Sequence, residues 1–124
     1  MENDRKLIML VDDNPANLRI GKNVLSGHYT VATAPSAAKM FFLLENNRPD
    51  LILLDIDMPE MDGFEAIKIL KDKTETRDIP VIFLTGKTES GDEDEGRSLG
   101  AAAYVVKPFD PASLLACIGE HLKT

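Results

Sequence analysis

The sequence predicts an α/β protein, a doubly wound parallel sheet of five strands with five helices on its two faces. Short apolar runs alternate with amphipathic segments along the whole chain, which is typical of repeated βα units. Several of these runs are almost wholly apolar, as strands covered on both faces are. Regular alternation also implies right-handed crossovers between parallel strands.

Three uniformly apolar runs, at residues 7–11, 51–54 and 81–84, are expected to form the central strands, because a central strand is buried on both faces. Residues 29–33 mix threonine with valine and alanine, and residues 104–106 form only a short run. These two segments therefore suit the edges of the sheet.

The helix starts are well marked. Asn14 and Asp110 each precede a proline, and Ser36 precedes an amphipathic segment, so all three are expected to be N-caps. The fourth helix is the weak one, because residues 91–98 contain two glycines and no apolar side chain before Leu99. We expect this helix to be short or mobile.

Composition narrows the function classes. The 124 residues, with 44% hydrophobic and 28% charged content, suit one compact domain spanning residues 1–124. A net charge of −7 argues against direct nucleic-acid binding and is compatible with an acidic pocket for a divalent cation. No apolar run approaches the roughly 20 residues of a membrane span, and no signal peptide is apparent, so we expect a cytoplasmic protein.

Polar side chains follow four of the predicted strands. Asp12 and Asp13 follow the first strand, Asp55 the third, Thr85 the fourth and Lys107 the fifth. The carboxyl ends of parallel strands meet at one edge of the sheet, where such folds bind ligands. Three carboxylates gathered there repel one another and favour a hard divalent cation, for which Mg²⁺ is the natural candidate. With a lysine and a hydroxyl beside them, the group suits phosphoryl transfer to Asp55 as a carboxylate nucleophile.

At these residues the chain resembles the receiver domains of two-component response regulators over essentially its whole length. The resemblance implies the flavodoxin-like receiver fold, with strand order 2-1-3-4-5. It also implies a signalling domain that catalyses only its own phosphorylation and dephosphorylation. The family pattern stands here as Asp12-Asp13, Asp55 with Met58-Pro59 and Asp62-Gly63, Thr85, and Lys107-Pro108-Phe109.

The resemblance implies a role for each site residue. Asp13, Asp55 and the backbone carbonyl of Asp57 would ligate Mg²⁺, and Asp12 would act largely through water. Asp55 would accept the phosphoryl group from a phosphohistidine of a sensor histidine kinase or phosphotransfer protein.

Further residues would read out or time the phosphorylated state. Lys107 and Thr85 would bind the phosphoryl oxygens. Tyr104 matches the aromatic switch position, although a plain strand aromatic accounts for it about as well. The signal would leave through the fourth helix, fifth strand and fifth helix, where phosphorylated receivers often form homodimers. Asp57 and Lys87 flank the route of the hydrolytic water, and we expect their pairing to slow hydrolysis.

Another reaction class and the output also have to be considered. Asp55 and Asp57, followed by Thr85 and Lys107, also resemble the haloacid-dehalogenase phosphatases, which form an aspartyl phosphate on Mg²⁺. There an acidic motif follows the lysine, whereas here the acidic pair precedes Asp55 and no room remains for a cap domain. The receiver interpretation is therefore favoured.

Residues 13–18 and 53–63 resemble receivers attached to cyclic-di-GMP enzymes or to hybrid kinases, which leaves a fused or separate output domain open.

Overall fold

The computed structural model describes residues 5–86, 90–107 and 110–122, and within the fourth helix it describes side chains from Asp94 onward. Five parallel strands form one sheet in the order β2-β1-β3-β4-β5, which confirms the predicted fold class and strand order. The strands are β1 (Leu7–Val11), β2 (Thr30–Ala34), β3 (Leu51–Asp55), β4 (Val81–Thr85) and β5 (Ala103–Val106). The helices are α1 (Pro15–Leu25), α2 (Ala37–Leu44), α3 (Gly63–Asp72), α4 (Ser90–Ser98) and α5 (Pro111–His121).

The central and edge strands fall within one residue of where the apolar pattern predicts them, with β2 shifted one residue later and β5 beginning one residue earlier. Every residue of β3 and β4 is buried, and so is all of β1 except its first residue. The edge strands β2 and β5 each have one buried residue. β3 and β4 extend one residue further than predicted and end on Asp55 and Thr85, so two of the polar candidates are held within the ladder itself.

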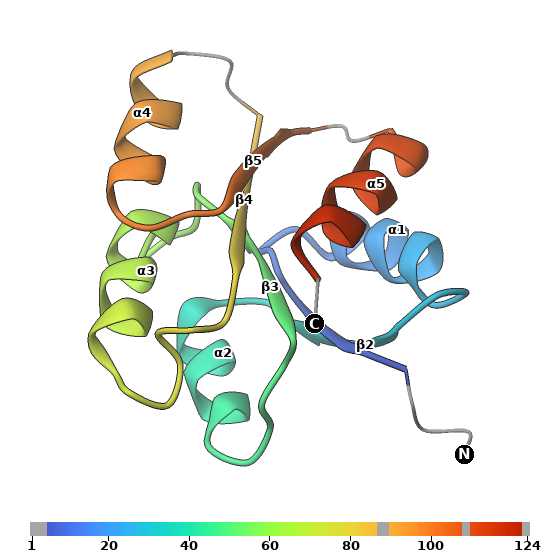
Figure 1. The fold of residues 1–124 in the computed structure, drawn as a ribbon, viewed down its shortest axis with the longest axis horizontal. Coiled ribbons are helices and arrows are strands. Elements are labelled where there is room, and N and C mark those ends of the chain that lie inside the picture. Colours follow the sequence, from blue (N-terminus) through green and yellow to red (C-terminus); the bar gives the residue numbers. More distant parts are fainter. Residues whose placement is uncertain (1–4, 87–89, 108–109, 123–124) are drawn as a thin grey trace.

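Helices cover both faces of the sheet (Figure 1). Alternate residues of each strand point to opposite faces, so Met9 and Val11 join one core while Ile8 and Leu10 join the other. The first core includes residues of α2 and α3, and the second includes residues of α1 and α5. The helix α4 lies on the same face as α2 and α3 (Figure 1).

The predicted N-caps are confirmed. Asn14, Ser36 and Asp110 each accept a hydrogen bond from a backbone N–H in the first turn of their helix. The helix α3 begins with a capping box that the sequence analysis did not single out. In it, the Asp62 side chain accepts from the Glu65 N–H and the Glu65 side chain accepts from the Asp62 N–H. These caps satisfy backbone donors that the first turn leaves without a helical partner.

The fourth helix, expected to be short or mobile, spans nine residues, one more than α2 and fewer than α1, α3 and α5. Its mobility stays a prediction. Gly96 explains how a helix without an apolar anchor packs. A Cβ built on Gly96 would lie 2.8 Å from the Phe83 ring, so the absence of a side chain lets α4 approach β4 directly. Phe83 in turn makes an edge-to-face contact with Phe64 of α3, with ring centroids 5.4 Å apart.

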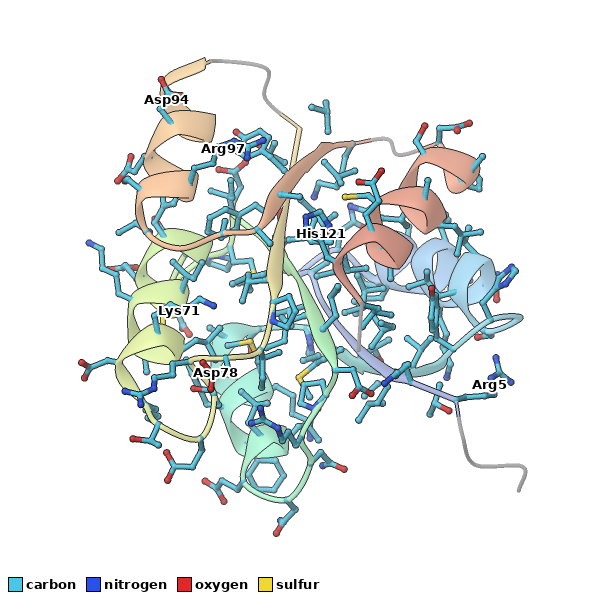
Figure 2. The ribbon with its side chains drawn as sticks, viewed as in Figure 1. Arg5, Lys71, Asp78, Asp94, Arg97 and His121 are labelled. Carbon is cyan, nitrogen blue, oxygen red and sulfur yellow. The ribbon has the colours of Figure 1, made fainter. Side chains whose placement is uncertain are left out.

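Lys71 ties the end of α3 to the loop that leads into β4. Its Nζ donates hydrogen bonds to the carbonyls of Arg77 and Ile79, both at 3.1 Å. Burial lowers the pKa of Lys71, while the Asp78 carboxylate, on the same side of the molecule (Figure 2), raises it. Gly100, with φ of 109°, lies against the aliphatic part of Lys71.

Among the described residues, none of the helices is long and apolar enough to cross a membrane.

Candidate functional site

The sheet brings the predicted site residues to its carboxyl edge. β1 and β3 end in register, so Asp12 leaves the sheet beside Asp55. Thr85 ends β4, which neighbours β3, and Lys107 directly follows β5. The candidates are therefore neighbours because of strand order, although they lie far apart in the sequence.

Three carboxylates meet at this edge. Asp12, Asp13 and Asp55 each offer one oxygen atom, and these oxygens all lie within 4.8 Å of one another. Asp12 and Asp55 are each only 1% exposed, while Asp13 is exposed. Carboxylate oxygens at such spacing are the ligands that a hard divalent cation prefers, and the exposed member leaves the group open to solvent. These residues therefore fit the predicted Mg²⁺ site.

Lys107 bridges two of the carboxylates. Its Nζ lies 3.1 Å from Asp12 Oδ2 and 3.1 Å from Asp55 Oδ1. Backbone donors hold the same two side chains, because the Asn14 N–H donates to Asp12 Oδ1 at 2.9 Å and the Asp57 N–H donates to Asp55 Oδ1 at 3.3 Å. The carboxylates are thus oriented by the protein before any ligand arrives.

The electrostatics of the cluster are unfavourable for the charged form of Asp55. Burial and then repulsion from Asp12 raise the pKa of Asp55 from 3.8 to about 7, against the lowering effect of Lys107 and of the Asp57 N–H. Burial lowers the pKa of Lys107, but the Asp55 and Asp12 carboxylates outweigh it and raise that pKa above its ordinary value. Lys107 therefore stays protonated, and three carboxylates around one ammonium leave the site with a net negative charge.

The candidate switch residues occupy the neighbouring strands. Thr85 is fully buried, and its carbonyl accepts a hydrogen bond of 2.6 Å from the Lys107 N–H. Tyr104 lies opposite Phe83 in the β4–β5 register and is half-buried against the core that Phe83 belongs to. Thr85 thus lies in β4 and Tyr104 in β5, the strand that Lys107 directly follows.

The remaining predicted residues lie next to this cluster or outside the described part of the chain, and the metal-ligand role of the Asp57 carbonyl stays a prediction. The Asp57 side chain is exposed at the start of the loop after β3. Lys87, which is expected to pair with it, lies outside the described residues, as do Pro108 and Phe109 of the Lys-Pro-Phe motif. The timing role of Asp57 and Lys87 stays a prediction.

Sequence reasoning missed the structural role of Gly63. A Cβ built there would lie 2.7 Å from the Asp55 carbonyl oxygen and 2.8 Å from the Ile56 Cα. Its N–H donates to the Ile56 carbonyl at 2.9 Å. Only glycine therefore lets the start of α3 rest against the backbone that carries Asp55. The signal in the sequence was a glycine placed directly after the cap residue Asp62.

Comparison with known proteins agrees with this geometry. The sequence model of the response regulator receiver domain matches residues 8–119. A probable cyclic di-GMP phosphodiesterase of Vibrio cholerae serotype O1 is 41% identical over 94% of this chain, which spans only 26% of that protein. The polar-differentiation response regulator DivK of Brucella anthropi is 38% identical, with 94% of this chain and 96% of DivK covered.

A solved structure extends the comparison to the metal. The receiver domain of a sensor histidine kinase from Pseudomonas aeruginosa PAO1 superposes with a TM-score of 0.88 at 28% identity, covering 97% of this chain and 99% of that one. That structure has a magnesium ion coordinated in its active site cleft. Asp12, Asp13 and Asp55 form an acidic triad at the carboxyl edge of a sheet that has the receiver strand order. Because the family model also matches most of the sequence, the chain belongs to the response regulator receiver domains of two-component signalling.

Proposed function

We propose that this protein is a phosphorylation switch that accepts a phosphoryl group on Asp55 from a phosphohistidine of a sensor histidine kinase or phosphotransfer protein. The observation that supports this most directly is the convergence of Asp12, Asp13 and Asp55, with Lys107 contacting two of them at 3.1 Å. An oriented carboxylate beside a fixed cation is what transfer to a carboxylate nucleophile requires.

In the proposed reaction an Oδ atom of Asp55 forms a bond to phosphorus. The bond between phosphorus and the imidazole nitrogen breaks, and its electron pair stays with the imidazole. Lys107 is already within hydrogen-bond distance of Asp55 Oδ1, so its ammonium would bind an oxygen of the transferred group. Asp13, Asp55 and the Asp57 carbonyl would hold Mg²⁺, with Asp12 acting largely through water, and the ion would supply positive charge that offsets the negative charge of the reacting groups.

The readout would begin at Thr85. We infer that its hydroxyl binds a phosphoryl oxygen, that Tyr104 turns inward as Thr85 moves, and that the change spreads over the α4, β5 and α5 surface. The backbone hydrogen bond between Thr85 and Lys107 supports this, because it joins the residue expected to move to the end of β5. Asp57 and Lys87 would set the lifetime of the phosphorylated state by restricting the hydrolytic water.

The chain would act on no substrate besides its own phosphoryl group. We propose that residues 1–124 form one receiver domain in the cytoplasm, and that phosphorylation promotes a homodimer. We propose a fused or separate output domain because one relative is a probable cyclic di-GMP phosphodiesterase and a solved neighbour belongs to a sensor histidine kinase. The net charge of −7 supports an output that does not rely on nucleic-acid binding by this domain.

The test is phosphorylation by acetyl phosphate with and without Mg²⁺, read by intact-protein mass spectrometry. Wild type is expected to gain one phosphoryl group that is acid-stable and base-labile, only with Mg²⁺, and Asp55→Asn is expected to gain none. A label that persists on Asp55→Asn would refute the assignment. The phosphatase alternative predicts instead continuous release of phosphate from a small monoester, abolished in Asp57→Asn.

A further inference from the structure

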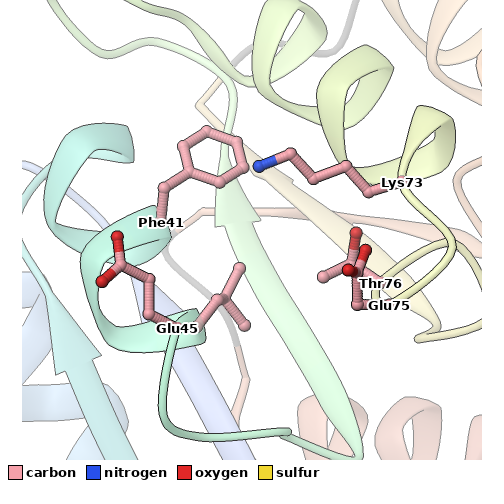
Figure 3. Close-up of a pocket in the computed structure, with 6 residues that line it drawn as sticks. Phe41, Glu45, Lys73, Glu75 and Thr76 are labelled. Atoms are coloured by element: carbon pink, nitrogen blue, oxygen red, sulfur yellow. The ribbon is translucent and has the colours of Figure 1, made fainter.

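A groove lies between the C-terminal ends of α2 and α3, away from the acidic triad. One cavity of about 350 Å³ is lined by Phe41, Leu44, Glu45, Lys73, Glu75 and Thr76 (Figure 3). A second cavity of about 580 Å³ shares four of these residues and continues along residues 46–48 to Ile79. In a parallel sheet the helices end where the next strands begin, so this groove lies at the edge opposite the one that holds Asp55.

The floor of the groove is apolar, and the Thr76 hydroxyl within it already makes a hydrogen bond within the protein. Phe41 and Leu44 are half-buried, and Ile79 is buried. The buried Thr76 hydroxyl donates to the Leu70 carbonyl at 2.6 Å, so its proton needs no hydrogen-bond acceptor from a ligand. An apolar floor of this kind binds an apolar side chain by removing both surfaces from water.

The basic side chains of the groove are already engaged. The Lys73 ammonium lies over the Phe41 ring, 5.4 Å from its centroid, and points toward that ring in Figure 3. The Arg48 guanidinium donates to the backbone carbonyl of Glu75. By contrast, the exposed carboxylates of Glu45 and Glu75 form no ion pair with any residue that the structure describes.

The two helices add to the negative character of the groove. α2 ends at Leu44 and α3 ends at Asp72, so both C-terminal ends, which carry partial negative charge, meet there. The charges of Lys73 and Arg48 offset those of the two carboxylates, so the partial negative charge of the two helix ends is what favours a cationic group beside the apolar floor.

We propose that this groove docks a peptide segment of a partner protein in which a leucine-like or aromatic side chain is flanked by lysine or arginine. The apolar side chain would rest on Leu44 and Ile79, beside the Phe41 ring over which Lys73 lies, and the flanking cations would face Glu45 and Glu75. This surface is separate from the phosphorylation site and from the proposed output surface. Docking there would therefore hold the partner in both states of Asp55, which goes beyond the switch function proposed above.

The test uses two short helical peptides of about 14 residues, one of leucine and lysine and one of serine and lysine, titrated into the labelled full chain and followed by amide NMR. The leucine peptide is expected to shift signals of residues 41–48 and 73–79, and the serine peptide to leave them unchanged. The double variant Glu45→Lys, Glu75→Lys is expected to lower the affinity for the leucine peptide at least about tenfold, since two attractive contacts become repulsive.

The matched control is the double variant Asp94→Lys, Glu120→Lys, which changes two exposed carboxylates on α4 and α5 and makes the same change in net charge; it is expected to change the affinity by less than about twofold. Equal weakening by the control would overturn the proposal, because it would reduce the effect to net charge. Shifts centred on α4, β5 and α5, or no saturable binding, would overturn it as well. If the NMR signals of residues 41–48 shifted when the protein was concentrated without peptide, the groove would bind a second copy of this chain. That result would overturn the proposal of a partner segment.

Discussion

The acidic triad should make the metal-free protein less stable than it would be without the Asp55 charge. Asp55 has a pKa of about 7 in the folded protein and an ordinary value of 3.8. Between these values the folded state binds more protons than the unfolded state, so the free energy of unfolding falls as pH rises from about 4 to about 7. Above that range the full cost of the charge remains. The variant Asp55→Asn keeps the shape without the charge, so we expect it to be more stable than wild type at pH 8.

The size of the effect follows from the two pKa values. A group at 3.8 unfolded and about 7 folded corresponds to about 4 kcal/mol if the whole difference is retained. Asp13 beside it is exposed, so water and salt reach the cluster and screen part of this energy. We therefore expect Asp55→Asn to gain about 1–2 kcal/mol in free energy of unfolding at pH 8.

The assay is urea unfolding of wild type and Asp55→Asn at several pH values, with EDTA or with Mg²⁺. The advantage of the variant is expected to be smallest near pH 4 and largest above pH 7. Mg²⁺ should stabilise wild type and have little effect on the variant, because a ligand that binds only the folded state stabilises it by mass action. Asp94→Asn, an exposed carboxylate on α4, is the control and should stay within about 0.5 kcal/mol. A variant that is less stable than wild type at pH 8, or an advantage that shrinks as pH rises, would refute the reasoning.

Three further predictions concern the helices. Gly96→Ala should destabilise the protein by about 1–3 kcal/mol in urea unfolding, because overpacking against Phe83 outweighs the better helix propensity; an increase in stability would contradict the contact. A Cβ at position 119 would have no atom within 4 Å, so Gly119→Ala should instead raise the free energy of unfolding by up to about 1 kcal/mol. A lower free energy of unfolding would contradict the open space at that position. Asp62→Ala should cost about 1 kcal/mol and speed amide exchange in the first turn of α3, since it removes the capping box with Glu65. Exchange that stays as slow as in wild type would count against that cap.

Strand positions and helix starts could be read from local pattern alone. The run before Asp55 is apolar at every position, and strands of that kind are central in a parallel sheet. Proline after Asn14 and Asp110 marks a first turn with little ambiguity. The meeting of Asp12, Asp55 and Lys107 could also be anticipated, because topology forces the carboxyl ends of parallel strands to one edge.

Contacts between elements could not be read in the same way. The sequence analysis counted Gly96 as a weakness of α4, since glycine has low helix propensity. Its closeness to Phe83 depends on how α4 rests on the sheet, which no local window contains. The groove beside Phe41 and Glu75 arises from the ends of two different helices, and the bridging of two carboxylates by Lys107 depends on distances that spacing along the chain does not fix.

The position of Phe83 has a consequence for sequence variation. A Cβ on Gly63 would lie 3.2 Å from the Phe83 ring and one on Gly96 would lie 2.8 Å from it, so the start of α3 and the last turn of α4 rest on one aromatic side chain. A larger residue at position 96 should then be tolerated when position 83 becomes smaller. Phe83→Leu is expected to act as a second-site suppressor of Gly96→Ala, with a favourable coupling energy in a double-mutant cycle. Among homologous chains, the residues at these two positions should vary together.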